Sequence, residues 1–339
     1  MRPDKKKPLG KVDVAVTALG LGTVAISNLF RSVTEAEAEE VINTAWDSGV
    51  NFFDTAPLYG HGLGELRLGH ALRHRKRDDF ILASKVGRLL RPRPRETIDF
   101  GAWVDVTPFE LAYDYSYDGT MRAFEDSLQR LALERMDVCF IHDIDVFTRG
   151  AEQPEVFKQA MDGCFKALAR LRDEGTVKAI GVGVNEWQVC QEALRQRDFD
   201  CFLLAGRYSL LEQGALESFL PRCAERRVSV VIGGGFNSGI LATGAVEGAR
   251  YNYGPAPPEI MDRVRAIETV CREYGVPLQA AAMQFVAAHP AIASLVVGAR
   301  SAQQLKQSIG WFDTRIPAEL WSELKSRGFL RDDAPTPSV

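Results

Sequence analysis

Four side chains suited to proton transfer stand where short apolar runs of the sequence end. Asp54, Lys85 and His142 each close such a run, and Tyr59 lies in the turn that follows Asp54. In a barrel of parallel strands, active sites are built at the C-terminal ends of the strands. We therefore expect these four residues to meet on one face of the protein and to form its catalytic site.

A tyrosine, a lysine, an acid and a histidine can together move one proton. A free tyrosine has a pKa of about 10, and a nearby ammonium such as Lys85 lowers that pKa by favouring the phenolate. Asp54 can keep Lys85 charged, and His142 can hydrogen-bond the reacting oxygen. Such a set would polarise a carbonyl group during reduction or take a hydroxyl proton during oxidation. It holds no hydride source, so the reaction requires a nicotinamide cofactor.

Each of these residues also has a plainer interpretation when it is taken alone. Asp54 could cap a helix, Lys85 could be solvated, and His142 could be a core histidine with its hydrogen bonds satisfied. The catalytic interpretation is favoured because the residues occur as a set at the ends of successive apolar runs.

Apolar runs and amphipathic segments alternate along the chain, which is typical of a parallel sheet covered by helices. Thr34 followed by Glu37 predicts a capping box at the start of the first helix. The expected strands cover residues 19–23, 50–54, 80–85, 138–142, 179–184, 202–205, 228–232 and 295–297. This order predicts one α/β domain over residues 1–339, a single (β/α)8 TIM barrel, with an N-terminal β-hairpin at 9–16 and tails at 1–8 and 331–339.

Two long βα loops are expected to lie over the active-site face. Residues 86–118 are basic and proline-rich, and loops of this length are usually functional or disordered. We predict that this segment is a substrate lid without regular structure, whose Trp103, Tyr113 and Tyr115 can stack on a sugar face or a pyridine ring. The second segment, 233–257, is rich in glycine.

The composition excludes several classes of function. A net charge of -4 without a broad basic excess argues against a nucleic-acid partner. The sequence has no apolar run of about 18 residues for a membrane span, and no apolar region of a signal peptide follows the basic N-terminus. Its six cysteines lack metal-ligand or redox spacing, so we expect reduced core thiols, no metal and a cytoplasmic location. The sequence gives no prediction of the oligomeric state.

The segment from Asp54 to Gly60, continuing through Gly64-Glu65 and Leu68-Gly69, resembles the signature of the aldo-keto reductase family. Ala83-Ser84-Lys85 and Ile141-His142 match the other two catalytic positions in order and context. The resemblance runs from about residue 10 to about residue 308. It implies a (β/α)8 barrel and an NAD(P)-dependent oxidoreductase. It assigns Tyr59 as acid/base, Lys85 and Asp54 as its tuning partners, and His142 as the residue that orients the substrate.

The resemblance also implies where the cofactor binds. Asn185 matches the asparagine that holds the nicotinamide carboxamide, although Val184 replaces the serine expected before it. Tyr208 matches an aromatic residue that stacks on the nicotinamide ring, although Ala205 replaces the usual glutamine. The glycine-rich loop at 233–239 has backbone amides that could approach a pyrophosphate, and its alternative is a plain flexible turn. The remaining expected contacts near the nicotinamide and pyrophosphate are Gly22, Thr23, Phe236, Asn237, Ser238, Gly239 and Leu241.

The segment that begins at Gly298 resembles the part of the family fold that binds the adenosine phosphate. Its expected contacts are Gly298, Arg300, Gln304 and Ser308. Relatives that prefer NADP place several basic residues at these positions to hold the 2′-phosphate, and among these contacts only Arg300 is basic. The resemblance therefore favours NAD over NADP.

Residues 204–213 and 236–239 resemble one branch of the family, which contains the NAD-linked D-threo-aldose 1-dehydrogenases and the pyridoxal 4-dehydrogenases. Both oxidise a cyclic hemiacetal to a lactone. The first hypothesis is a dehydrogenase acting on C1 of an aldose such as L-fucose or L-galactose. The close alternative oxidises pyridoxal to 4-pyridoxolactone. Two further alternatives are a general NADPH-linked aldehyde reductase and a nucleotide-binding regulatory protein on the same fold.

Overall fold

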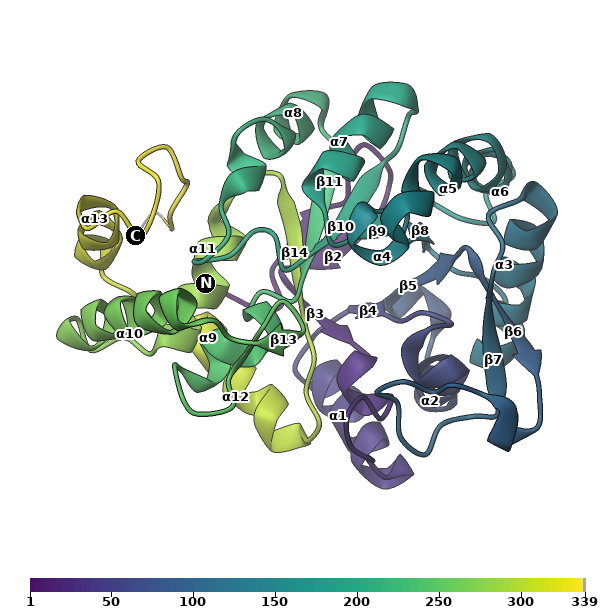
Figure 1. The fold of residues 1–339 in the computed structure, drawn as a ribbon, viewed down its shortest axis with the longest axis horizontal. Coiled ribbons are helices and arrows are strands. Elements are labelled where there is room, and N and C mark those ends of the chain that lie inside the picture. Colours follow the sequence, from purple (N-terminus) through teal and green to yellow (C-terminus); the bar gives the residue numbers. More distant parts are fainter. Residues whose placement is uncertain (338–339) are drawn as a thin grey trace.

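The computed structural model describes residues 1–337, and within them eight parallel strands close into a barrel surrounded by helices (Figure 1). The strands are β3 (Leu19–Gly22), β4 (Phe52–Asp54), β5 (Ile81–Val86), β8 (Val138–His142), β9 (Ala179–Val184), β10 (Cys201–Ala205), β11 (Ser229–Gly233) and β14 (Ile292–Val297). Each pairs in parallel with the next in this order, and β14 closes the ring on β3. The predicted (β/α)8 barrel is confirmed, and each expected strand overlaps one of these eight.

Helices form a ring around the barrel (Figure 1). The longer ones are α1 (Glu35–Asp47), α2 (Leu63–Leu72), α3 (Tyr117–Leu131), α5 (Gln153–Gln159), α6 (Phe165–Asp173), α7 (Trp187–Gln196), α8 (Phe219–Arg226), α10 (Pro258–Glu273), α11 (Leu278–Ala288), α12 (Ala302–Asp313) and α13 (Ala318–Ser326). The predicted capping box starts α1, because the Glu37 amide donates to the Thr34 hydroxyl and the Thr34 amide donates to the Glu37 carboxylate.

Alternating side chains of the barrel strands build two layers of core. Phe52 and Phe140 point inward and pack in the barrel interior, whereas Phe53 and Cys139 point outward and pack beneath the helices. This alternation is what a closed parallel barrel requires of buried strands.

An N-terminal hairpin closes one end of the barrel. β1 (Lys6–Pro8) pairs antiparallel with β2 (Ala15–Thr17), and apolar side chains of this segment, such as Leu9 and Val16, join the interior core. The predicted hairpin is present, but Lys6–Pro8 belong to it and not to a tail as expected. Lys7 is fixed there because its ammonium donates to the Ala287 and Ile292 carbonyls, each at 3.0 Å.

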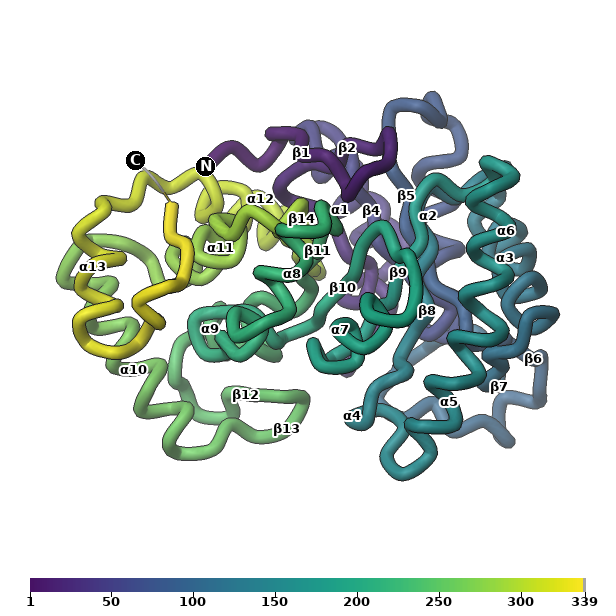
Figure 2. Tube along the Cα trace, turned by 90° about the horizontal axis from the view of Figure 1, so that it is seen from above, coloured from purple at the N-terminus to yellow at the C-terminus, as the bar shows by residue number. Residues whose placement is uncertain are grey.

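The two long βα loops contain regular structure at the opposite end. β6 (Arg88–Pro92) pairs antiparallel with β7 (Phe109–Tyr113), so the prediction of a structureless 86–118 segment was wrong. Pro92 is the last residue of β6 in this two-stranded ribbon, where its missing amide hydrogen does no harm. β12 (Arg250–Tyr251) and β13 (Gly254–Pro255) form a second small hairpin in the 233–257 segment. Figure 2 shows β12–β13 at the end of the molecule opposite β1–β2.

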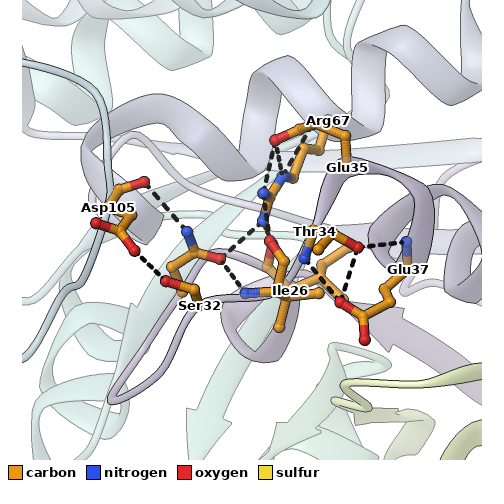
Figure 3. Close-up of polar contacts among 9 residues, drawn as sticks. Ile26, Ser32, Thr34, Glu35, Glu37, Arg67 and Asp105 are labelled. Carbon is orange, nitrogen blue, oxygen red and sulfur yellow. Dashed lines mark hydrogen bonds and ion pairs between the residues drawn. The ribbon is translucent and has the colours of Figure 1, made fainter.

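A buried arginine fixes the first βα loop. Arg67 of α2 donates to the Ile26 carbonyl, to the Asn28 side chain at 3.0 Å and to Glu35 at 2.6 Å (Figure 3). The Asn28 amide in turn donates to the Asp105 carbonyl at 3.2 Å. This network ties the loop after β3 to the segment between β6 and β7.

Candidate active site

Three neighbouring strands bring the predicted acid, lysine and histidine together. Asp54 ends β4, Lys85 lies near the end of β5, and His142 ends β8, and these strands are adjacent in the barrel. All three side chains are buried, at 3%, 1% and 6% exposure respectively. Tyr59 follows β4 and lies next to them, so the structure assembles the predicted set on the C-terminal face of the barrel.

The turn after Tyr59 depends on glycine. Gly60, His61 and Gly62 have φ angles of 63°, 54° and 100°, a conformation that L side chains rarely adopt. A Cβ on Gly60 would also lie 2.5 Å from the Ser27 carbonyl oxygen. His61 tolerates the turn because its ring nitrogen lies 2.6 Å from the Phe109 carbonyl oxygen, which anchors the turn to β7.

Lys85 is bound on one side and faces Tyr59 on the other. Its ammonium donates to both carboxylate oxygens of Asp54, at 2.9 and 2.8 Å, and to the Thr55 carbonyl at 2.8 Å. The same nitrogen lies 4.7 Å from the centre of the Tyr59 ring. Burial lowers the pKa of Lys85, but Asp54 and Tyr59 together more than offset this, so the net pKa is raised and Lys85 stays charged.

The pKa of Tyr59 lies above its usual value of 10, not below it as the sequence predicted. Burial disfavours the phenolate more than the Lys85 ammonium favours it, and the Asp54 charge beside that ammonium opposes it further. Tyr59 therefore keeps its proton near neutral pH, and Lys85 limits the cost of releasing it.

His142 is held as a neutral imidazole. Burial, followed by the nearby charges of Arg88 and Lys85, lowers its pKa well below 6.5. Its ring lies edge-on to the Tyr59 ring, with the ring centres 6.1 Å apart. Its Nδ1 is buried and has no hydrogen-bond partner among residues 1–337. A neutral imidazole beside a protonated phenol can orient a carbonyl or hydroxyl oxygen between the two rings.

Sequence reasoning missed two charged residues next to His142. Asp143 follows it with a left-handed φ of 50°, and Arg88 donates to the Asp143 carboxylate at 2.6 Å. Both side chains are buried. The run of arginines after Lys85 gave Arg88 no distinguishing signal, and the pattern around His142 gave none for Asp143.

The three aromatic residues predicted to contact substrate have different surroundings. Trp103 pairs with Leu29 across an antiparallel bridge, and its ring centre lies 6.4 Å from that of Tyr59, which puts it beside the site. Tyr113 is half-exposed between the guanidinium groups of Arg88 and Arg149.

The prediction for Tyr115 was wrong. Its side chain is 2% exposed, and its hydroxyl donates to the carbonyls of His142, at 2.8 Å, and Asp143, at 3.0 Å. A ring buried in this way leaves no face for a substrate. Tyr115 instead fixes the backbone that carries His142.

The predicted nicotinamide contacts are separated in the structure. Asn185 follows β9 on the active-site face, and its side-chain carbonyl accepts from the Tyr253 hydroxyl at 3.0 Å. Tyr208 is fully buried, with ring centres of Phe285 and His289 at 5.2 and 5.7 Å. The prediction that Tyr208 stacks on nicotinamide was therefore wrong, because both of its neighbours lie in the core.

The glycine-rich loop leaves open space for a ligand at one point. Ser238 and Gly239 have φ angles of 59° and 104°, and a Cβ added to Gly239 would meet no atom within 4 Å. Asn237 is buried, and its amide donates to the Gly206 carbonyl at 2.9 Å. Leu241 is fully buried, so only its backbone could contact a ligand.

The other predicted cofactor residues surround this loop. Gly22 ends β3, the Thr23 hydroxyl lies 2.8 Å from the Thr55 hydroxyl, and Phe236 packs against Trp311.

Residues of the expected adenosine segment contact the first βα loop. Arg300 donates to the Leu29 carbonyl at 3.3 Å, and its own amide donates to the Gln304 side chain at 2.9 Å. The Ser308 hydroxyl donates to the Gln304 carbonyl at 3.1 Å, and Gly298 follows directly after β14. Burial, and then the charge of Arg31, lower the pKa of Arg300, so this segment has a second cation nearby that the sequence did not indicate.

Comparison with known proteins identifies the class to which this fold and site belong. Residues 18–327 match the model of the aldo/keto reductase family. The chain therefore belongs to the aldo/keto reductase family, and it is an oxidoreductase that uses NAD(P).

Two related proteins match nearly the whole chain. The chain is 42% identical to pyridoxal 4-dehydrogenase of Microbacterium luteolum, over 97% of this chain and 99% of that protein. It is 39% identical to D-threo-aldose 1-dehydrogenase of a Pseudomonas species, over 96% of both. Among solved structures, aldo-keto reductase AKR11C1 from Bacillus halodurans, in its holo form, matches with a TM-score of 0.74, at 27% identity and 95% coverage of both chains.

Neither a membrane-spanning helix nor a metal-binding cluster occurs in the part of the chain that the structure describes. None of its helices combines the length and apolarity that crossing a bilayer needs. The described residues also contain no group of three or more histidine, cysteine, aspartate or glutamate side chains placed to hold a metal ion.

Proposed function

We propose that Tyr59, Lys85, Asp54 and His142 are the catalytic residues of an NAD-linked dehydrogenase that oxidises the C1 hemiacetal of an aldose to a lactone. The observation that carries the proposal is the buried Lys85 ammonium, which is bound to Asp54 and lies 4.7 Å from the Tyr59 ring. Beside them, His142 is neutral, and its Nε2 lies 3.6 Å from the Asp143 carboxylate without a hydrogen bond.

Each of these residues has its own role in the proton transfer. The hemiacetal oxygen would lie between Tyr59 and the His142 ring. For oxidation Tyr59 first releases its own proton to solvent, and the phenolate then takes the hemiacetal proton as the C1 hydride leaves. Lys85 stabilises the negative charge that Tyr59 carries during the exchange, and Asp54 keeps Lys85 protonated. The nicotinamide cofactor supplies the hydride acceptor for the C1 hydrogen.

The open space at Gly239 fits a bound dinucleotide. In this proposal Asn185 holds the carboxamide, and Gly22, Thr23 and residues 236–241 line the nicotinamide and pyrophosphate. Arg300, Gln304, Ser308 and Gly298 hold the adenosine end. NAD is preferred because Arg300 is the only basic residue among these four contacts and donates to the Leu29 carbonyl. Arg31 lies close enough to lower the pKa of Arg300, and it is the feature that favours the NADP alternative.

The second candidate is oxidation of pyridoxal to 4-pyridoxolactone, which the 42% identity to a pyridoxal 4-dehydrogenase favours. Trp103 offers an aromatic face beside Tyr59 that suits a sugar ring or a pyridine ring. Both reactions convert a cyclic hemiacetal to a lactone, so the same four residues serve either one.

Absorbance at 340 nm distinguishes these candidates. Purified protein is mixed with NAD or NADP and with L-fucose, L-galactose, D-arabinose or pyridoxal in parallel. We expect NADH to form with the sugars. Turnover of pyridoxal alone would establish the second candidate, and silence with all four substrates would contradict both.

Two remaining alternatives have simple tests. A general NADPH-linked aldehyde reductase would bind NADPH more tightly than NADH. A regulatory protein would keep its partner interaction after Tyr59→Phe. The chain is 24% identical to a probable voltage-gated potassium channel subunit beta of Arabidopsis thaliana, which motivates that control. The six cysteines are free and buried, which supports the proposed cytoplasmic location.

A further inference from the structure

Asp143 adopts a conformation that glycine would adopt more readily. Its φ of 50° lies in the left-handed region, which is strained for a residue with a side chain, although aspartate tolerates it better than most. Three contacts impose this conformation: the Asp143 amide donates to the Gly183 carbonyl, the Tyr115 hydroxyl donates to the Asp143 carbonyl, and Arg88 binds the carboxylate. Strained residues that the fold holds in this way cluster at functional sites.

One oxygen of the Asp143 carboxylate accepts no hydrogen bond. Its Oδ2 accepts from Arg88 at 2.6 Å. Its Oδ1 lies 3.6 Å from the His142 Nε2, too far for a hydrogen bond, and accepts from no other donor in residues 1–337. Asp143 also contributes to the raised pKa of Tyr59, which puts its charge within reach of the reacting groups.

The Arg88 guanidinium also has nitrogens that donate no hydrogen bond. It is 3% exposed, and its Nε and Nη1 are buried without a hydrogen-bond partner in the described part of the chain. Only Nη2 donates, to Asp143 at 2.6 Å and to the Tyr113 hydroxyl at 3.4 Å. A buried ion pair with unused donors and an unused acceptor is costly unless a ligand completes it.

We infer that Asp143, paired with Arg88, binds the hydroxyl group on the carbon next to the reacting carbon. Oxygens on neighbouring carbons stand about as far apart as hydrogen-bonded atoms. The 3.6 Å between His142 Nε2 and Asp143 Oδ1 therefore suits a substrate whose reacting oxygen meets His142 while the adjacent hydroxyl meets Asp143.

This subsite selects 2-hydroxy hemiacetals, which include the aldoses, over plain aldehydes and 2-deoxy sugars. A site built to hydrogen-bond a hydroxyl rejects an analogue that lacks it, because its own buried polar groups are then left unpaired. The inference rests on the proposed function, since it names the feature of the aldose that the site recognises.

The test compares L-fucose with 2-deoxy-L-fucose, using NAD and steady-state kinetics. For the wild-type protein we expect kcat/KM to be about 10²- to 10⁴-fold higher with L-fucose. Asp143→Gly tolerates the left-handed backbone and removes the carboxylate. We expect it to lose about 100-fold in kcat/KM with L-fucose but less than about 3-fold with the deoxy sugar, so the preference collapses.

Two further variants separate recognition from folding. Asp143→Asn tolerates the same backbone and keeps one acceptor oxygen, so it should retain a preference that is about 10-fold weaker than in the wild type. Asp262→Ala removes an exposed carboxylate on α10 and should behave as wild type. NAD affinity, measured by quenching of protein fluorescence, should be the same in all four proteins.

Each outcome decides the question. If the wild type oxidises L-fucose and both Asp143 variants keep its full preference over the deoxy sugar, the inference fails while the proposed function stands. If the wild type oxidises neither sugar with either cofactor, the proposed function fails and the inference fails with it. If Asp143→Gly does not fold, the weaker preference of Asp143→Asn carries the test, and an unchanged preference there overturns the inference.

Discussion

The residues proposed for proton transfer and the hairpin that covers them are held in opposite ways. Lys85 and Asp54 project from adjacent barrel strands, are almost fully buried and satisfy each other. Tyr253, at the tip of the β12–β13 hairpin, is 54% exposed. Its side chain reaches Asn185 by one hydrogen bond and Phe147 by ring contact at 5.8 Å.

The difference indicates which parts of the site can move. Lys85 cannot shift without breaking a buried ion pair, so the geometry of the proton set is fixed before any ligand binds. The hairpin makes few buried apolar contacts, which is typical of segments that open locally at low cost. We expect substitutions at the strand ends to abolish chemistry or stability, and substitutions in the hairpin to change binding only modestly.

The largest effect is expected at Tyr59. Tyr59→Phe removes the exchangeable proton but keeps the ring, so kcat should fall by about 10²- to 10⁴-fold while NAD affinity is unchanged. Rates are measured at 340 nm and affinity by fluorescence. A variant that keeps more than about a tenth of wild-type kcat would show that another group transfers the proton.

Lys85→Met should be both inactive and unstable. It leaves the Asp54 carboxylate buried without its cation, which costs about 3 to 5 kcal/mol of unfolding free energy in urea titrations. Adding Asp54→Leu removes the unpaired charge and should restore most of that stability without restoring activity. Equal stability of the single variant and the wild type would mean that the ion pair does not hold the site together.

Two buried histidines should make the protein lose stability in acid, one inside the site and one outside it. Burial lowers the pKa of His289 to about 4, and burial with nearby cations lowers the pKa of His142 well below 6.5. Below pH 6.5 the unfolded chain binds protons that the folded chain excludes, so the unfolding free energy falls as pH drops towards the folded-state pKa values. The expected loss is about 1 to 3 kcal/mol per histidine between pH 7 and pH 4.

Urea titrations of the wild type and of His289→Gln between pH 7 and pH 4 test this directly. The variant should lose less stability than the wild type over that range. If the unfolding free energy fell with pH by the same amount in both proteins, the assignment of a lowered pKa to His289 would be contradicted.

Tyr115→Phe should act on the position of His142 and not on substrate contact. It removes the hydrogen bonds to the His142 and Asp143 carbonyls and should cost about 1 to 2 kcal/mol of stability, with a lower kcat and an unchanged KM. Tyr113→Phe, whose hydroxyl lies 3.4 Å from Arg88, is the matched control and should be nearly neutral. A raised KM in Tyr115→Phe at full stability would indicate that Tyr115 contacts the substrate.

The smallest effect is expected in the hairpin. Tyr253→Phe frees the Asn185 side-chain carbonyl that the tyrosine hydroxyl occupies, so NAD should bind about 2- to 10-fold more tightly. Tyr251→Phe lies on the same hairpin and contacts Glu212 instead, so its NAD affinity should be unchanged. Weaker NAD binding in Tyr253→Phe would mean that the hydroxyl contacts the cofactor.

The features that could be predicted from the sequence are those that a local pattern of residues determines. The strands ending at Asp54, Lys85 and His142 follow from apolar runs of fixed length, and their common face follows from the parallel barrel. The capping box at Thr34 is equally local, since its two partners are three residues apart. The common location of these strand-end residues could therefore be predicted from the order of the strands along the chain.

What tertiary contacts determine could not be predicted in this way. Tyr115 lies in an aromatic stretch and Tyr208 matches a stacking position of the family, yet distant partners bury both. Arg88 pairs with a residue 55 positions away, and nothing in its neighbourhood identifies that partner. The pKa of Tyr59 depends on burial and on the charges of Lys85 and Asp54, which only the folded chain brings around it.

One measurement tests the proposed chemistry most directly: transfer of deuterium from C1 of labelled L-fucose to NAD, in the wild type and in Tyr59→Phe. The proposal predicts deuterated NADH and a lactone from the wild type, with formation at least about 100-fold slower in Tyr59→Phe. Unlabelled NADH from the wild type, or deuterium transfer that survives Tyr59→Phe at full rate, would contradict it.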